Sequence, residues 1–306
     1  MTTPLTKFLK TLTITALCTL ATGLQSCFTG IESTPKITYK ESGKDKGRLT
    51  PEQQIAAEFT PAPASGWRTG KEFYVTSDRA GLVLRGTGPL SPGDIITYAG
   101  KSESRSVTGT TVTDMRFTRA GNRADTLVWR APSVETPALP FLVDMDLIAA
   151  MRSALVGNRY YIRTALWYTP DGHLVNGRKF IPVEIIDIRP YSADFPAMVT
   201  FRTEDGAAEG HVMMSENRPN ATRTFDTLFA VDNPRRQFPQ TTDDNWRAIQ
   251  NSQTREGMTR AEVRAALGAP AKIDRGQNQS AAFERWTYTD GVTLMFVDGI
   301  LSNEVM

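Results

Sequence analysis

Apolar and polar residues follow different patterns in three parts of this chain. Residues 8–24 form an apolar, threonine-rich stretch without an acidic residue. Between residues 67 and 233, short runs of alternating, β-branched and aromatic residues are separated by glycine, proline and aspartate, which is typical of short strands. From residue 243 onward, apolar residues recur first at helical and then at strand spacing. The pattern predicts a mainly β protein with a small α+β domain at its C-terminal end.

The β-rich region predicts two tandem barrel-like units, over residues 67–156 and 157–238. The two halves share aromatic and β-branched residues: residues 73–76 match 160–163 at an offset of 87, residues 95–96 match 185–186 at 90, and Phe117 with Phe141 match Phe201 with Phe225 at 84. Each unit is expected to end in a short helical stretch, at residues 142–155 and 225–230. The alternative is that unrelated strand-rich stretches share such residues by chance.

The pattern of residues 239–306 predicts two short helices followed by strands. Residues 245–250 have helical spacing, and a second helix is expected to begin after Thr259, whose hydroxyl forms a capping box with Glu262. Met258 and Val263 are placed to form the hydrophobic staple around this cap. The helix is expected to end at Gly268, two residues before Pro270. Its apolar face should consist of Ala261, Val263, Ala265 and Leu267.

Three antiparallel strands are expected after these helices, at residues 283–289, 292–297 and 300–305. The dipeptides Asp290-Gly291 and Asp298-Gly299 join them, because glycine tolerates the positive φ of a tight turn. The side chains expected to face the helices are Trp286, Tyr288, Val292, Leu294 and Phe296. The predicted domain is therefore ααβββ.

The residues of this domain resemble those of the SmpA/OmlA (BamE-like) lipoprotein domain in order and spacing. The resemblance rests on Gly257, Met258, Thr259, Glu262, Val263, Leu267, Gly268, Pro270, Trp286, Tyr288, Phe296 and Gly299. That family consists of envelope lipoproteins without catalytic residues, and its best-known member is an accessory of the outer-membrane β-barrel assembly machine. The resemblance implies a scaffold or partner-binding role. Capping, turns and core packing explain most of these residues, so we expect them mainly to specify the fold.

The N-terminal pattern predicts export and lipidation. Lys7 and Lys10 open the apolar stretch, and Leu24-Gln25-Ser26-Cys27 ends it. A secretory signal has three parts: a positively charged start, an apolar stretch too short to span a membrane, and a small residue before the cleavage site. The ending resembles a bacterial lipobox, although Gln25 is larger than the usual residue. We therefore expect a signal peptide over residues 1–26, cleavage between Ser26 and Cys27, and acyl chains such as palmitate on Cys27. The alternative is an ordinary cysteine near the end of a signal peptide.

Residues 27–66 are expected to form a flexible tether behind the lipidated cysteine, because they are rich in Thr, Ser, Lys, Glu, Gly and Pro. One short helix is predicted within this segment. Thr50 supplies a capping hydroxyl, Pro51 stands at the first helical position, and Gln53 can reach back to the cap.

The charge balance and the small numbers of histidine and cysteine argue against several classes of function. The chain has 35 Lys and Arg against 33 Asp and Glu, and removing Lys7 and Lys10 with the signal lowers its formal net charge from +2 to 0, which argues against nucleic acid as a partner. His173 and His211 each lack a second His, a Cys or a tight Asp/Glu cluster at metal-ligand spacing, and two cysteines cannot form a four-thiolate zinc site. Asp144 and Asp146 are better explained as acids at a helix start than as a catalytic pair. No cofactor, metal or catalytic residue is expected.

These observations lead to the expectation of a non-enzymatic lipoprotein, anchored to the cell outer membrane by lipid, that binds other envelope proteins. Phe28 favours the outer membrane, because it is not the acidic residue that retains some lipoproteins at the inner membrane. Two alternatives remain open. An inhibitor of a secreted enzyme would present aromatic residues on the exposed face of its C-terminal sheet. An enzyme acting on glycan or cell-wall substrates would need a cleft with two suitably spaced carboxylates and an aromatic platform.

Overall fold

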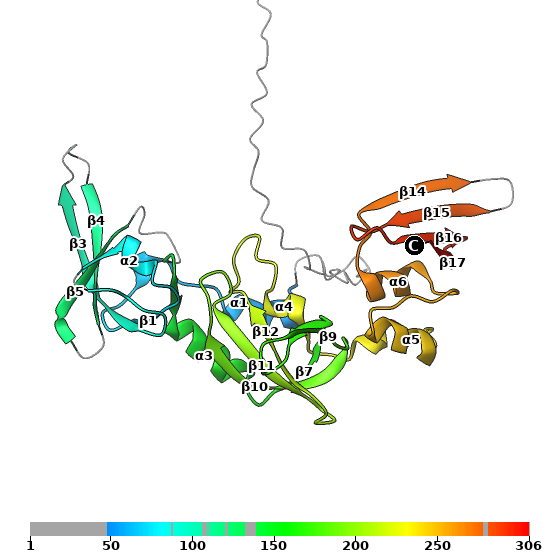
Figure 1. The fold of residues 1–306 in the computed structure, drawn as a ribbon, viewed down its shortest axis with the longest axis horizontal. Helices are drawn as coiled ribbons and strands as arrows, with labels where there is room; N and C mark the ends of the chain where they lie inside the picture. Colours follow the sequence, from blue (N-terminus) through cyan, green and yellow to red (C-terminus); the bar gives the residue numbers. More distant parts are fainter. Residues whose placement is uncertain are drawn as a thin grey trace, which may run out of the picture. The chain divides into compact units, whose positions relative to one another are not determined.

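The computed structural model describes residues 48–86, 88–105, 109, 111–119, 122–131, 139–277 and 281–305 (Figure 1). Over these residues the protein is mainly β, as predicted, and its strands form three antiparallel sheets. The predicted signal peptide, the cleavage site at Ser26 and Cys27, and the first part of the predicted tether lie outside the described residues.

The first sheet has the strand order β2-β5-β4-β3-β1-β6. Its strands are β1 (Glu72–Val75), β2 (Leu84–Arg85), β3 (Ile95–Arg105), β4 (Thr111–Arg119), β5 (Asn122–Ala131) and β6 (Leu142–Asp144), with the short helix α2 (Ala80–Val83) before β2. An aromatic cluster fills its core, where Trp67, just after the 3₁₀ turn η1 (Ala64–Gly66), contacts Phe73 at a ring distance of 4.7 Å. Aromatic rings stabilise such a core through their large buried area.

The second sheet has the strand order β13-β7-β10-β11-β12-β8-β9. Its strands are β7 (Arg159–Ile162), β8 (Leu166–Tyr168), β9 (Leu174–Asn176), β10 (Ile181–Pro190), β11 (Ala197–Thr203), β12 (Glu209–Met214) and β13 (Phe229–Ala230), and the short helix α4 (Phe225–Leu228) precedes β13. Inward residues alternate along these strands, and Val183, Ile185, Val199 and Phe201 are almost fully buried.

The two sheets share one connectivity. When β7, β8, β10, β11, β12 and β13 are matched with β1, β2, β3, β4, β5 and β6, the strand order is the same in both, and only β9 is extra. Both sheets also carry a bulge in equivalent strands, after Tyr98 in β3 and after Ile185 in β10. These positions differ by 87, as do Phe73 and Tyr160. This agreement supports the prediction of two related units.

Strand register corrects two of the predicted residue matches between the units. Phe73 pairs with Ile96, and its counterpart Tyr160 pairs with Val183, so Ile96 corresponds to Val183 and not to Ile186. The match of Phe141 with Phe225 is also wrong, because β6 and β13 align Leu142 with Phe229. The helical stretches are not equivalent either, because one follows β6 and the other precedes β13.

Helix α1 (Pro51–Glu58) belongs to the folded part of the protein. Thr50 and Gln53 form the predicted capping box. The helix packs on the core of the second sheet, where Ala56 and Phe59 are buried. Glu52 accepts a hydrogen bond from the Val231 amide at 3.1 Å. The predicted tether, with its boundary at residue 66, therefore ends earlier than expected, because the sequence does not show where an apolar helix face will dock.

Helix α3 (Met145–Leu155) also packs on the second sheet. Leu147, Ile148, Met151 and Leu155 lie in the core of that sheet. The helix begins at Met145 and not at Leu142, because residues 142–144 pair with β1 as strand β6. The first sheet is thus inserted between two helices that both cover the second sheet.

The C-terminal domain contains α5 (Asp243–Gln250), α6 (Arg260–Leu267), β14 (Lys272–Gln277), β15 (Ala282–Thr287), β16 (Thr293–Val297) and β17 (Ile300–Val305). Both helices lie on one side of a four-stranded meander (Figure 1). The three predicted strands are present, but the prediction of a three-stranded sheet is wrong, because β14 adds a fourth. On α6, Ala266 is buried in place of the predicted Ala261, which is exposed.

Candidate functional site

The first residues of the family-like motif connect the start of α6 to β17. Gly257 has a φ of 86°, which favours glycine, and its amide donates to the Leu301 carbonyl at 2.8 Å. The Leu301 amide donates in return to the Met258 carbonyl at 2.8 Å, and the Met258 side chain is fully buried. This segment therefore holds the helix against the last strand.

Glu262 is the polar centre of the domain. Its Oε2 accepts hydrogen bonds from the Thr259 amide at 2.7 Å and hydroxyl at 2.9 Å, and the Glu262 amide donates to Thr259 Oγ1 at 3.3 Å. These contacts complete the predicted capping box. Burial alone would raise the pKa of Glu262, but hydrogen bonds from Thr259, Thr241 and Asn245 outweigh burial and hold this pKa below its ordinary value.

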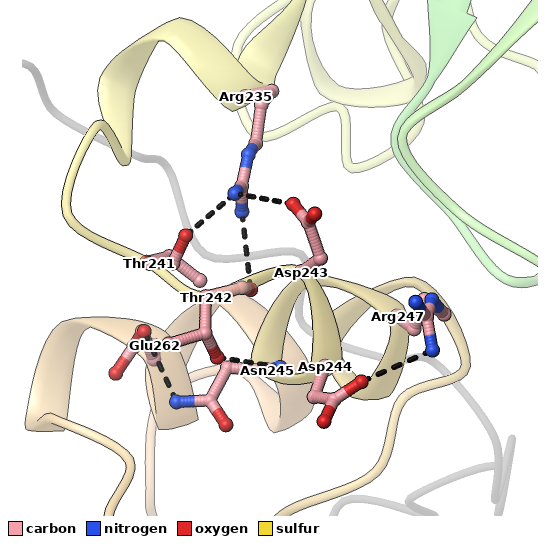
Figure 2. Close-up of polar contacts among 8 residues, drawn as sticks. All are labelled: Arg235, Thr241, Thr242, Asp243, Asp244, Asn245, Arg247 and Glu262. Carbon is pink, nitrogen blue, oxygen red and sulfur yellow. Dashed lines mark hydrogen bonds and ion pairs between the residues drawn. The ribbon is translucent and has the colours of Figure 1, made fainter.

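Figure 2 shows how this network reaches beyond α6. The side-chain amide of Asn245, on α5, donates to Glu262 Oε1 at 3.4 Å. The backbone amide of Asn245 donates to Thr242 Oγ1 at 3.2 Å. Arg235, in the 3₁₀ turn η2 (Pro234–Gln237), donates to the Thr241 carbonyl at 2.5 Å and contacts Asp243 at 3.2 Å. Glu262 therefore joins the two helices, and Arg235 fixes the segment that leads into them.

The remaining motif residues lie in the core or in turns. Val263, Trp286 and Phe296 are fully buried, and Leu267 packs against them. Gly268 ends α6 with a φ of 89°, and its carbonyl accepts a hydrogen bond from the Tyr288 hydroxyl at 3.3 Å. Pro270 follows in the connection to β14, and Gly299 forms the β16–β17 turn with a φ of 85°. The motif thus mainly supports the fold of the domain.

A different set of residues forms the outer face of the C-terminal sheet, which is the side away from the helices. The pairs Phe283–Val297 and Val297–Ile300 place three apolar side chains in one row, and Met295 stands beside Arg285 in the next row. None of these apolar side chains belongs to the buried core, and Ile300 is 42% exposed. A Cβ added at Gly276, which pairs with Phe283, would meet nothing within 4 Å. Phe283, Met295 and Val297 are half-buried, so the outer face is a partly exposed apolar patch.

Charged residues border this patch on one side. Asp274 of β14 lies 3.1 Å from Arg285 and 2.9 Å from Lys272. An apolar centre with a polar border is the usual composition of a protein-binding surface. Sequence reasoning placed β15 and β16 but did not identify this face, because Phe283, Met295 and Val297 alternate with the core residues and are equally apolar.

A cleft of about 510 Å³ lies between the segment after α1 and the start of α3. Lys71 Nζ lies 2.6 Å from a carboxylate oxygen of both Asp144 and Asp146. Asp144 also accepts a hydrogen bond from the Asp146 amide at 3.0 Å as the N-cap of α3, which confirms the prediction that these two acids stand at a helix start. Both carboxylates therefore form an ion pair with Lys71, and the Asp144 carboxylate also caps α3. Trp67, at the edge of the cleft, is buried and donates to the Ala62 carbonyl.

The two histidines have different partners. His173 contacts Asp171 at 2.7 Å in an exposed turn, and His211 stacks on Tyr168 with ring centroids 5.5 Å apart. Burial lowers the pKa of His211. Across the ranges that the structure describes, no group of three His, Cys, Asp or Glu side chains is arranged to hold a metal ion.

Sequence reasoning missed a second concave surface, which we name the arginine pocket. It has a volume of about 340 Å³ and is lined by Arg260, Ala261, Arg264, Arg275, Glu284 and Trp286. The four-residue spacing of Arg260 and Arg264 on α6 was a visible signal. Arg275 could not be added to this pair, because β14 was not predicted.

Within the described ranges, no helix is long and apolar enough to cross a membrane. No known protein family matches the sequence, and no curated protein matches it significantly.

Proposed function

We propose that this protein is a non-enzymatic lipoprotein of the cell envelope, anchored to the outer membrane through Cys27, which binds another envelope protein through the outer face of its C-terminal sheet. The partly exposed row of Phe283, Val297 and Ile300, with Met295 beside it, is the observation that carries this proposal. The lipobox-like ending at Cys27 supports the location. The SmpA/OmlA resemblance agrees with a binding role, and membership of that family is part of the proposal.

The fold gives this face a rigid support. Directly behind it, Trp286, Leu294 and Phe296 pack against α5 and α6, and the Glu262 network fixes both helices. A rigid apolar face loses little conformational entropy on binding, so its burial contributes efficiently to affinity. Phe283 and Met295 are residue types that are enriched at the centre of protein interfaces.

Crosslinking in intact membranes tests the proposal. A photoreactive amino acid in place of Thr293, on the outer face, should capture a specific envelope protein. Met295→Glu should reduce this capture by about tenfold, because a carboxylate in an apolar interface must be desolvated. The matched control is Met198→Glu, a partly exposed methionine on β11 of the second sheet, which should not change the capture. Absence of any specific product, or equal loss in both variants, would contradict the proposal.

An inhibitor of a secreted enzyme is the second candidate, because the outer face does present an aromatic side chain, Phe283. The two candidates differ in the captured protein. If it is an enzyme, its activity should fall as this protein is added, and Met295→Glu should remove the inhibition. A glycan-cleaving function has less support, because Asp144 and Asp146 share Lys71 in place of acting as separate acid and base.

A further inference from the structure

Three arginine side chains converge on the helix-facing side of the C-terminal sheet, in the arginine pocket. Arg260 and Arg264 come from successive turns of α6, and Arg275 comes from the edge strand β14. Glu284 of β15 pairs with Arg275 across the sheet. This surface lies on the opposite side of the sheet from the outer face and shares no residue with it.

The pocket carries more positive than negative charge. Glu284 Oε1 lies 3.5 Å from Arg260 Nη1 and 3.3 Å from Arg275 Nε, and Glu284 Oε2 accepts a hydrogen bond from Trp286 Nε1 at 2.9 Å. The indole hydrogen bond and the two arginines hold the pKa of Glu284 below its ordinary value, so this residue is ionised at neutral pH. Three guanidinium groups and one carboxylate line the pocket, which leaves a formal charge of +2.

Arg264 differs from the other two arginines. Its guanidinium lies over the Trp286 ring, 5.0 Å from the centroid, and no carboxylate within the described ranges forms an ion pair with it. Stacking occupies the flat face of a guanidinium, while its N–H groups lie along the edge and remain able to donate. Arg264 is therefore oriented by the indole and can still bind an anionic group.

The neighbouring strand β14 is the open edge of the sheet. At the opposite edge, residues 257–259 cover the start of β17 through the Gly257–Leu301 and Leu301–Met258 hydrogen bonds. β14 pairs with β15 on one side, and no described strand pairs with its other side. A strand edge of this kind can accept an extended peptide, with main-chain hydrogen bonds giving affinity and alternate side chains giving specificity.

We propose that β14 and the arginine pocket together bind an extended acidic peptide segment of a partner protein. The peptide backbone adds to β14 as a fifth strand at a spacing of about 4.8 Å, and the acidic side chains on its helix-facing side bind Arg264 and Arg275. The excess positive charge of the pocket selects carboxylates, and the alternation along a strand selects acidic residues at every second position.

Fluorescence anisotropy with a labelled peptide of alternating Glu and Val tests this proposal on the purified full-length protein. The Glu peptide should bind at least about tenfold more tightly than the same peptide with Gln, because bonds from arginine to carboxylate are charge-assisted. The double variant Arg264→Gln with Arg275→Gln should lose a similar factor. Arg285→Gln, on the opposite side of the same sheet, is the matched control and should bind as the unmodified protein does.

Two further probes separate strand addition from simple anion binding. Methylation of alternate backbone nitrogens in the Glu peptide keeps its charge but removes every second N–H donor. Only one of the two alternating sets of N–H groups can face β14, so methylation of that set should abolish binding. Inorganic phosphate should compete only weakly. Equal binding of the Glu and Gln peptides, full binding of both methylated peptides, or equal loss in Arg285→Gln would overturn the proposal. Met295→Glu, on the outer face, should leave peptide binding unchanged. A failure of the peptide-binding proposal can therefore be distinguished from a failure of the proposed function, which depends on the outer face.

Discussion

Glu262 shows how one side chain can organise the C-terminal domain. It is only 5% exposed, yet it accepts hydrogen bonds from the Thr259 amide and hydroxyl and from Asn245. A buried carboxylate is stable only when hydrogen bonds replace its lost hydration. Here those donors come from the helix start that the carboxylate caps and from the neighbouring helix.

Glu262→Gln should lower the free energy of unfolding by about 1–2 kcal/mol at neutral pH, because the amide cannot accept all of these hydrogen bonds. The pKa of Glu262 in the folded state lies below its ordinary value of 4.5. Its ionic contribution is therefore present above pH 4.5 and is lost as the pH falls through the folded-state pKa. Urea unfolding at pH 7 and in this acidic range should show a smaller difference between the two proteins under acidic conditions.

Glu256→Gln is the matched control for this prediction. Glu256 is an exposed glutamate in the connection before α6, so its replacement should change stability by less than about 0.5 kcal/mol. If both variants lose the same stability, the capping role assigned to Glu262 is wrong.

The capping box was predictable from sequence because its partners lie three residues apart, at Thr259 and Glu262. The contacts with Asn245 and Thr241 were not predictable, because they depend on how α5 lies against α6. Local hydrogen bonds follow from spacing, whereas contacts between elements follow from packing that a single sequence does not display.

At the scale of elements, the connection between β9 and β10 attaches the second sheet to the C-terminal domain. Phe180 lies in the C-terminal core and stacks on Trp246 with ring centroids 5.8 Å apart. The preceding residue, Lys179, donates its amide to the Gln250 carbonyl at 2.9 Å and its ammonium to the Ala266 carbonyl. Phe180 has a φ of 56°, a strained value for a residue with a side chain, which the surrounding contacts maintain.

Phe180→Ala should lower the free energy of unfolding by about 3 kcal/mol, because it removes a buried ring and keeps the strained backbone. Phe180→Gly removes the same ring but relieves the positive φ. Its free energy of unfolding should therefore be higher than that of the alanine variant, by up to about 1 kcal/mol. This order is the reverse of the usual one. Thermal unfolding of both variants checks it, and a clearly less stable glycine variant would refute the assignment of strain.

The missed strand and the misplaced boundaries have physical causes. β14 reads Lys-Ile-Asp-Arg-Gly-Gln, and its single apolar residue gives no alternation because an edge strand contributes little to the core. Leu142 and Val143 are apolar residues that suit a helix as well as a strand, and the pairing of residues 142–144 with β1 decides between them. Strongly amphipathic segments such as α6 were therefore predictable, and segments decided by pairing were not.

For the whole molecule, the repeated connectivity of the first two sheets explains the similar aromatic positions in the sequence. Phe117 and Phe201 occupy equivalent places, each opposite the residue that precedes the bulge. The sequence suggested this relation, but inserted segments of different length blurred the offsets. Hydrogen-bonded register resolves the equivalent residues, because it counts pairs across strands and not positions along the chain.

Cys27→Ala should move the protein from the membrane pellet to the soluble fraction, because a cysteine-linked lipid is the proposed membrane attachment. Fractionation of cells that express each form measures this. Cys18→Ala is the control, because Cys18 lies within the predicted signal peptide. Retention of the Cys27 variant in the pellet, at unchanged abundance, would remove the lipid anchor from the proposed function.

The docking of α1 has a mechanical consequence. This helix precedes the first sheet in the chain, yet it is held by the second, through Phe59 and through Glu52, whose Oε1 lies 3.5 Å from Arg163. A pulling force applied to the N-terminal end of the chain would reach α1 before either sheet. The load would then pass directly into the second unit, and the first sheet would carry tension only after α1 had peeled away.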